Sequence, residues 1–142
     1  MANAVATLFM CGVAWFVQVV HYPLFAQVGQ SRFRVYHAEH SSRTSLVVVL
    51  PMIVELASSI WLAFDPPAAS GGDPLTALAV AGAILAAGTW IVTFGGAVPA
   101  HQALEPGFDD AIHRRLMRSN LLRTLIWTAH GGVVVALLAL AS

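Results

Sequence analysis

The segment Arg32-Phe-Arg-Val-Tyr-His-Ala-Glu-His-Ser-Ser-Arg43 decides the fold together with its counterpart Arg114–Arg123, because the two hold all seven basic residues of the chain. Each follows one long apolar run and leads into another. The loop between the two halves, residues 65–73, carries acids and no base. Basic residues concentrate in the cytoplasmic loops of membrane proteins. We therefore predict a multi-pass protein of a bacterial-type inner (plasma) membrane, with both arginine segments cytoplasmic and both termini on the outer side.

The composition agrees with this interpretation. Of the 142 residues, 58% are hydrophobic and 10% are charged, and the mean hydropathy is +0.75. These values exclude an ordinary soluble domain. The formal net charge is zero, so nothing favours a nucleic-acid partner, and the expected partner is the lipid bilayer. The sequence leaves open whether the protein forms an oligomer.

Four apolar segments are long enough to cross a membrane, which takes roughly 20 residues in a helix. They cover residues 4–25, 44–64, 75–98 and 121–140. We predict a single all-α domain over residues 1–142. Its architecture is an antiparallel, up-down four-helix transmembrane bundle with short interfacial helices in the two cytoplasmic loops.

Polar residues mark the expected start of the first interfacial helix. Ser31 is placed to cap a short helix from Arg32 to Ser42. Within this segment Glu39 precedes Arg43 by four residues, an order that favours an ion pair on a helix.

Acidic residues mark the start of two other helices. Asp73 is placed to cap the third span, with Pro74 at its first helical position, after a short outer turn. Asp109 and Asp110 open a helix that carries three arginines and continues into the fourth span.

The two halves of the chain resemble each other loosely. If this is a true repeat, it relates two helical hairpins by an axis along the membrane normal. The alternative is that any outward-to-inward helix followed by an amphipathic return produces such a pattern. The recurring residues are Tyr22-Pro23, Phe33, His37 and Arg43-Thr44 in the first half, and Val98-Pro99, Phe108, His113 and Arg123-Thr124 in the second.

Glu55 is the polar residue most at odds with its surroundings. It lies about 16 Å into the second span at 1.5 Å per residue. An ionised carboxylate at this depth is costly, so an acid inside the membrane indicates a functional site. The alternative is that Glu55 only clamps a neighbouring helix by hydrogen bonding. His130 of the fourth span lies at a similar depth, and we expect the two side chains to be in direct or water-bridged contact.

A polar stripe runs along the fourth span and must face the interior of a bundle that is surrounded by lipid. The first span carries a matching stripe of Trp15, Gln18, Tyr22 and Phe25, and together they predict a polar pocket that opens to the cytoplasm. The stripe of the fourth span comprises Asn120, Arg123, Thr124, Trp127 and His130. The candidate catalytic residues are Glu55, His130 and Arg123, and the candidate ligand-binding residues are Gln18, His21, Tyr22, His101, Asn120 and Trp127.

His37 and His40 are the candidate metal ligands. They lie three residues apart on one helix face, so their imidazoles could ligate one metal ion or a haem iron. The alternative is an interfacial helix on which these histidines and Arg43 contact lipid phosphates. His21 precedes Tyr22-Pro23, where the proline allows the first helix to end.

Two motifs of the second half carry a likeness to a known family. They are Val98-Pro-Ala-His-Gln-Ala-Leu104 and Asn120-Leu-Leu-Arg-Thr124. Together they resemble the third-loop pattern of the anthrone-oxygenase-like family of small four-span membrane proteins. Where that family has an Asn after Val-Pro, this chain has His101. The resemblance implies a four-helix membrane scaffold and, in some members, oxygenation of polycyclic phenolic substrates.

A fainter likeness involves the first half. Trp15-Phe16, His21-Tyr-Pro23 and Tyr36-His37 are similar to segments of small haem-binding, protoporphyrinogen-oxidase-like membrane proteins. This resemblance implies a haem cofactor.

Three function classes follow from these observations. The first is a membrane oxidoreductase or oxygenase that acts on a hydrophobic aromatic or quinone-like substrate, with Glu55 and His130 dividing the acid and base roles. The second is a haem- or metal-binding membrane protein. The third is a non-catalytic accessory or transport subunit, in which the polar stripe only holds the helices together. The sequence does not decide whether the protein is an enzyme.

Overall fold

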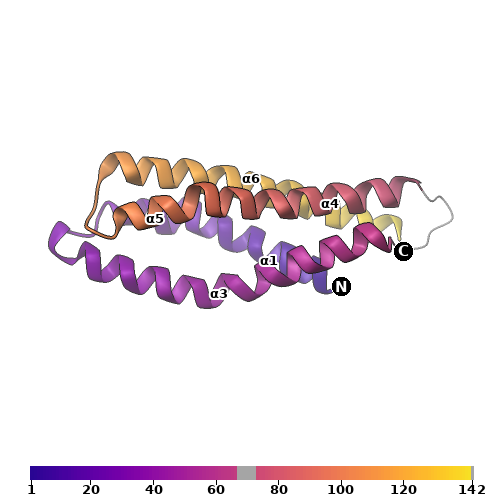
Figure 1. Ribbon diagram of the computed structural model, residues 1–142, viewed down its shortest axis with the longest axis horizontal. Helices are drawn as coiled ribbons and strands as arrows, with labels where there is room; N and C mark the ends of the chain where they lie inside the picture. The colour runs from indigo at the N-terminus through magenta and orange to yellow at the C-terminus, as the bar shows by residue number, and fades with distance from the viewer. Residues whose placement is uncertain (67–72, 142) are drawn as a thin grey trace.

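The computed structural model describes residues 1–66 and 73–141, and every regular element in that part of the chain is helical. Four antiparallel rods form an elongated bundle (Figure 1), which confirms the predicted all-α four-helix architecture. Two rods are single long helices, and each of the other two contains a π-helical turn. The elements are α1 (Ala2–Phe16), η1 (Val17–His21), α2 (Tyr22–Phe25), α3 (Gln30–Phe64), α4 (Asp73–Val92), η2 (Thr93–Ala97), α5 (Val98–Leu104) and α6 (Asp110–Leu140).

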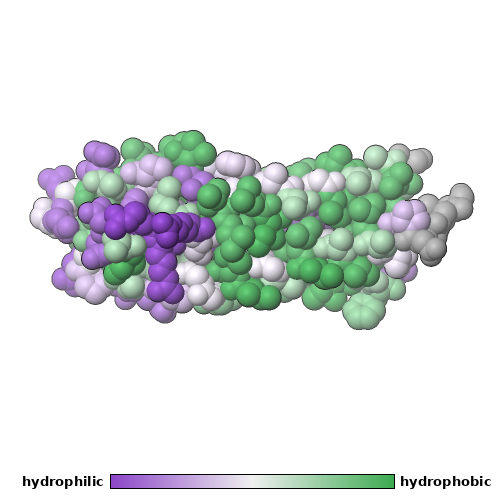
Figure 2. Space-filling view, turned by 90° about the horizontal axis from the view of Figure 1, so that it is seen from above, coloured by the Kyte–Doolittle hydropathy of each residue, from purple (hydrophilic) through white to green (hydrophobic). Residues whose placement is uncertain are grey.

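The two arginine segments lie at one end of the bundle. The α2–α3 and α5–α6 connections meet there, and both chain termini lie at the opposite end (Figure 1). Hydrophilic residues gather at the arginine end in Figure 2, and apolar residues cover most of the remaining length on that face. The fold therefore has the charge asymmetry that the sequence predicts.

The outer surface of the bundle is apolar. Leu46, Ile84 and Ile91 expose 81%, 65% and 71% of their surface. The described chain contains four helices that are long and apolar enough to cross a membrane. The 35-residue α3 is about 52 Å long at 1.5 Å per residue, well beyond the roughly 30 Å of a bilayer core. Its polar first turns therefore extend past the hydrocarbon at the arginine end.

The interfacial helix predicted from Arg32 to Ser42 is not a separate element. The helix α3 begins at Gln30 and continues without a break to Phe64, and its N-cap is Gly29 with no side-chain cap from Ser31. No glycine or proline lies between Ser42 and the span, so the backbone hydrogen bonds simply continue. The exposed ion pair between Glu39 and Arg43, with Nε 2.8 Å from Oε2, is present as predicted.

The prolines of the first and third rods lie inside helical segments: the first rod continues past Pro23 to Phe25, where the predicted span also ends, and the third continues past Pro99 to Leu104. A five-residue π-helical turn precedes each X-Pro pair, η1 before Tyr22-Pro23 and η2 before Val98-Pro99. Proline has no N–H and clashes with the carbonyl four residues back, and a wider turn removes this conflict. The shared device supports the internal repeat seen in the sequence.

The helix starts at the acidic residues agree with prediction where they are described. Asp109 caps α6 and accepts hydrogen bonds from the backbone N–H of Ala111 and Ile112 at 2.8 and 2.9 Å. The helix α4 begins at Asp73. The predicted capping side chain of Asp73 and most of the outer turn, residues 67–72, lie outside the described part of the chain.

Candidate functional site

Glu55 of α3 lies at the centre of a closed polar network. His130 Nδ1 is 2.7 Å from Glu55 Oε1, and Trp127 donates through Nε1 to Glu55 Oε2 at 2.8 Å. The side chains of Glu55 and His130 are 0% and 1% exposed. The contact predicted between Glu55 and His130 is therefore present.

Helix α1 closes the other side of this network. Ser59 Oγ lies 3.5 Å from His130 Nε2 and accepts a hydrogen bond from Asn3 Nδ2 at 2.8 Å. Gly82 of α4 lies against the same imidazole, because a Cβ added there would be 3.3 Å from His130 Nε2. All four rods thus contribute to the enclosure of His130. This arrangement agrees with the structural alternative for Glu55, and an acid–base role for the pair stays a prediction.

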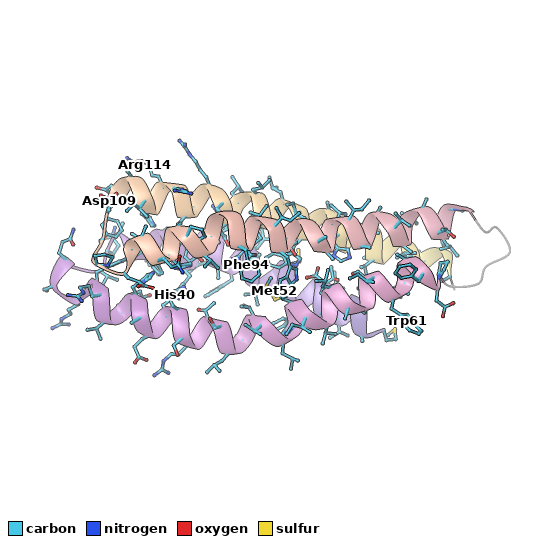
Figure 3. The ribbon with its side chains drawn as sticks, viewed as in Figure 1. His40, Met52, Trp61, Phe94, Asp109 and Arg114 are labelled. Carbon is cyan, nitrogen blue, oxygen red and sulfur yellow. The ribbon has the colours of Figure 1, made fainter. Side chains whose placement is uncertain are left out.

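A cavity of about 460 Å³ lies nearer the arginine end, between α3 and the α4–η2–α5 rod. Its rim includes the exposed residues Val49 and Phe94 on the side of the bundle, and Gln102 and Glu105 towards the arginine end. In Figure 3, His40 and Met52 of α3 and Phe94 lie along this side of the bundle. The predicted pocket opens at the end that carries the arginines, and the cavity has exposed lining residues there as well as the exposed apolar residues Val49 and Phe94 on the side of the bundle.

The inner end of the cavity is polar. Tyr22 and His101 both line it, and the Tyr22 hydroxyl is 2.8 Å from His101 Nε2. Trp127, which is fully buried, and Arg123 complete this end. The apolar wall consists mainly of Met10, Val13, Ala14, Val17, Val48, Met52, Trp90 and Ala97.

Arg123 turns into the bundle, as predicted, and does not extend to the surface. Its Nη2 donates to Asn120 Oδ1 at 2.9 Å and its Nη1 to Thr93 Oγ1 at 3.3 Å. Its guanidinium carbon lies 5.2 Å from the centre of the Trp127 ring, which is a cation–π distance. Asn120 in turn donates to Gln18 Oε1 at 2.8 Å. Arg123 is therefore held in place by groups from α6, η1 and η2.

Three of the predicted ligand-binding residues do not line the cavity. Gln18 and Asn120 lie behind Arg123 and position it. His21 lines a separate groove between α1 and α3, together with Arg43. Tyr22, His101 and Trp127 do line the cavity, as does Arg123.

The predicted metal ligands His37 and His40 have different hydrogen-bond partners, and their role as ligands stays a prediction. His37 Nε2 is 3.0 Å from His101 Nδ1, whereas His40 Nδ1 is 2.7 Å from His21 Nε2. Among the described residues, no group of three His, Cys, Asp or Glu side chains is arranged to hold a metal ion. Both ring nitrogens of His101 lie within hydrogen-bond distance of other side chains, Tyr22 and His37, and a haem cofactor stays a prediction.

Several residues of these sites, Ser59 among them, escaped the sequence analysis. Thr93 binds Arg123, Asn3 binds Ser59, and Glu105 lies on the rim of the cavity. A signal existed for Thr93, because Thr89 and Thr93 lie one turn apart in an otherwise apolar span. Asn3 and Glu105 lie outside the predicted spans, where polar residues are ordinary.

Together, the four apolar rods and the inward-facing polar stripe define a small multi-pass integral membrane protein with a cavity between its helices. Comparisons with protein families, with curated proteins and with solved structures find no match to this chain. The resemblance to the anthrone-oxygenase-like family therefore stays a prediction.

Proposed function

We propose that this protein binds a hydrophobic aromatic or quinone-like molecule in the cavity between α3 and α5 and acts on it as an oxidoreductase. The observation that carries this proposal is the polarity of the cavity. Its side opening, at Val49 and Phe94, is apolar, and its inner end carries Tyr22, His101 and Arg123. A molecule dissolved in the bilayer would enter through the side and place its oxygen atoms at the polar end.

The inner end offers groups that suit an oxygen-bearing ring. The fixed guanidinium of Arg123 can donate to a carbonyl or phenolate oxygen, and its geometry favours planar recognition. The Tyr22 hydroxyl can donate a proton or accept one. The aromatic side chains of Trp90, Phe94 and Trp127 supply flat apolar contacts for a ring. Pockets for small molecules commonly combine an apolar wall with a few placed polar groups in this way.

The reaction class follows from this chemistry. A bound quinone takes two electrons from a separate redox carrier and two protons at its carbonyl oxygens, and it becomes a quinol. Arg123 stabilises the negative charge that appears on an oxygen before its proton arrives. The Tyr22 hydroxyl donates the proton to the oxygen at the polar end, and the other carbonyl oxygen takes its proton from water at the rim of the cavity. The resemblance to the anthrone-oxygenase-like family supports the aromatic substrate class.

Titration of the detergent-solubilised protein with decylubiquinone and with alizarin, a dihydroxyanthraquinone, tests the proposal. Trp90 and Trp127 line the cavity, so intrinsic fluorescence reports its occupation. We expect saturable quenching by at least one of these probes. Val49→Phe, which narrows the mouth, should weaken binding several-fold.

Leu46→Phe is the matched control, because Leu46 is exposed on the same helix and does not line the cavity. It should leave the affinity unchanged. If neither probe quenches saturably, or if both substitutions weaken binding equally, the proposal is wrong. The non-catalytic accessory role, in which polar groups only hold helices together, would then be favoured.

We also infer that the arginine end faces the cytoplasm of a bacterial-type inner membrane and that both termini are outside. The support is that the two segments with all seven arginines adjoin the α2–α3 and α5–α6 connections, which lie together at one end of the bundle. A reporter that is active only in the cytoplasm should be silent at the C-terminus and active when fused after Pro106. The reverse pattern of activity would invert the orientation.

A further inference from the structure

A second hollow lies at the arginine end, next to the cavity. It has a volume of about 800 Å³, and its lining includes Arg34, Glu39 and Glu105. Because these charged residues surround it, the hollow is accessible to water at the polar end of the bundle. His37 lines this hollow, whereas His101 and Tyr22 line the cavity.

A continuous chain of hydrogen bonds joins the two spaces. His37 Nε2 lies 3.0 Å from His101 Nδ1, and His101 Nε2 lies 2.8 Å from the Tyr22 hydroxyl. The three side chains come from α3, α5 and α2, so the tertiary structure alone assembles the chain. Each group can both donate and accept a proton, which is what transfer along such a chain requires.

We infer that His37, His101 and Tyr22 form a proton relay from the polar hollow to the molecule bound in the cavity. This inference rests on the proposed function and specifies how the reacting oxygen receives its proton. The ligand itself fills the mouth of the cavity and keeps water from the inner end, so the proton travels behind it. His37 and His101 act through Tyr22, which is the member of the relay that touches the ligand.

The protons balance at every step. A proton from the hollow binds His37 Nδ1, and the proton on His37 Nε2 moves to His101 Nδ1. The proton on His101 Nε2 moves to the Tyr22 oxygen, and the original Tyr22 hydroxyl proton passes to the ligand oxygen. Each imidazole ends as its other tautomer, no electron moves along the chain, and a ring rotation or a reverse transfer resets the tautomers.

Other charged and titratable groups adjoin the relay. The His40 ring stacks on His101 with ring centres 5.6 Å apart, but its Nδ1 bonds to His21 and Thr44 and stays outside the chain. Glu105 lines both the hollow and the cavity, so it offers a competing path for a proton. Glu105→Gln separates the two paths, because it removes the carboxylate of the competing path and none of the three hydrogen-bonded side chains of the relay.

A pH jump on the alizarin-bound protein tests the relay. Alizarin changes colour when its phenolate is protonated, so stopped-flow absorbance measures the rate at which the bound molecule receives a proton. Tyr22→Phe and His37→Ala should both slow this step by roughly 10²-fold, a typical contribution of a positioned proton-transfer group. External imidazole should restore the rate in His37→Ala, and a substitution with a merely structural effect would not respond to it.

Two further variants keep the test decisive. His37→Gln preserves a hydrogen-bonding side chain in case His37→Ala folds poorly, and it should also be slow. His113→Gln is the control. The His113 imidazole also lies next to Tyr22, but it bonds to the backbone carbonyl of Tyr22 at 2.8 Å and not to the hydroxyl. It should react at the wild-type rate.

The outcomes separate this inference from the proposed function. Tight binding of alizarin with unchanged protonation rates in Tyr22→Phe and His37→Gln would overturn the relay alone. A large loss of rate in Glu105→Gln with none in His37→Gln would replace it with the direct path. Failure of the wild-type protein to bind alizarin and decylubiquinone would overturn the proposed function and the relay with it.

Discussion

The Glu55–His130 network and the Arg123 end of the cavity lie on the same stripe of α6, two turns apart, yet they differ in what surrounds them. Around His130, helices α3 and α4 approach closely, α1 bonds to Ser59, and both ring nitrogens lie within hydrogen-bond distance of α3 side chains, Glu55 and Ser59. Around Arg123, the wall opposite is a cavity between α3 and η2–α5. Trp127 belongs to both regions, because its N–H bonds to Glu55 while its ring lines the cavity.

This difference separates two uses of polar groups in a membrane. A buried group whose partners are all within the protein stabilises the bundle and specifies which helix faces meet. A polar group held in place beside empty space can bind something else. Neither the charge of a residue nor its depth distinguishes these uses. Glu55 lies deeper in the bundle than Arg123, yet its carboxylate contacts only protein groups.

The largest expected effect comes from removing the centre of the closed network. Glu55→Leu leaves His130 Nδ1 and Trp127 Nε1 without their acceptor, at a cost of about 1–3 kcal/mol for each group. Thermal unfolding of the detergent-solubilised protein, followed by circular dichroism, should show a clear loss of stability. Glu55→Gln retains hydrogen-bonding atoms and should unfold near the wild-type temperature. Equal stability of the two variants would show that the network contributes little.

The second effect tests whether the cavity end is also held by close packing. Gly96 of η2 faces Ser119 of α6, and a Cβ added there would overlap Ser119 Oγ and lie 3.2 Å from Ser119 Cβ. Gly96→Ala should therefore destabilise the protein by about 1–3 kcal/mol, as overpacking does. Gly95→Ala is a matched control, because no atom lies within 4 Å of its added Cβ. A stable Gly96→Ala variant would mean that η2 shifts freely.

The third effect addresses binding and leaves stability largely unchanged. Arg123→Lys keeps the positive charge but loses the fork that contacts Asn120 and Thr93. We expect the affinity for alizarin or decylubiquinone to fall about tenfold, which corresponds to about 1.4 kcal/mol, while insertion and folding persist. Fluorescence titration measures the change. Wild-type affinity in Arg123→Lys would reduce Arg123 to a residue that sets topology.

The smallest effect concerns a polar pair that lies in neither region. Arg43 and Glu39 expose 80% and 62% of their side chains, so their ion pair is worth only about 0.3–0.5 kcal/mol. Glu39→Gln should therefore leave the unfolding temperature and the probe affinity almost unchanged. A loss of stability as large as that of Glu55→Leu would contradict the distinction between buried and exposed polar groups.

The rods were predictable from the sequence, and the predicted ends at Phe25, Phe64 and Leu140 agree with the structure, but the extension of the helices towards the arginine end was not predicted. Hydropathy locates the four spans, and the helical spacing of Asn120, Trp127 and His130 correctly places them inside the bundle. The sequence did not predict how the helices accommodate their prolines. Pro23 and Pro99 each follow a π-helical turn, and the helix continues past them. A local steric rule gives the cost of a proline in a regular helix, but the surrounding bundle decides whether a wider turn absorbs that cost.

Most residues of the candidate site could be predicted from the sequence, but their contacts with one another could not. Its members on α6 follow one periodic stripe, and periodicity is a local property of the chain. The partners of His37 and His40 are His101 and His21, which lie 64 and 19 residues away along the chain, and spacing within one helix cannot reveal them. For the same reason the i, i+3 pattern indicated shared ligands where the structure has two separate hydrogen bonds.

The sequence by itself determined that this is a four-span bundle with its basic residues at one end and a polar stripe inside. Hydrophobicity, charge and helical periodicity act locally, so each can be read along the chain. Only the tertiary structure decided that Glu55 and His130 are enclosed while Tyr22, His101 and Arg123 border a cavity. Whether a polar group is satisfied or left facing a space depends on how closely other helices approach it, and that distance is a property of the packed bundle.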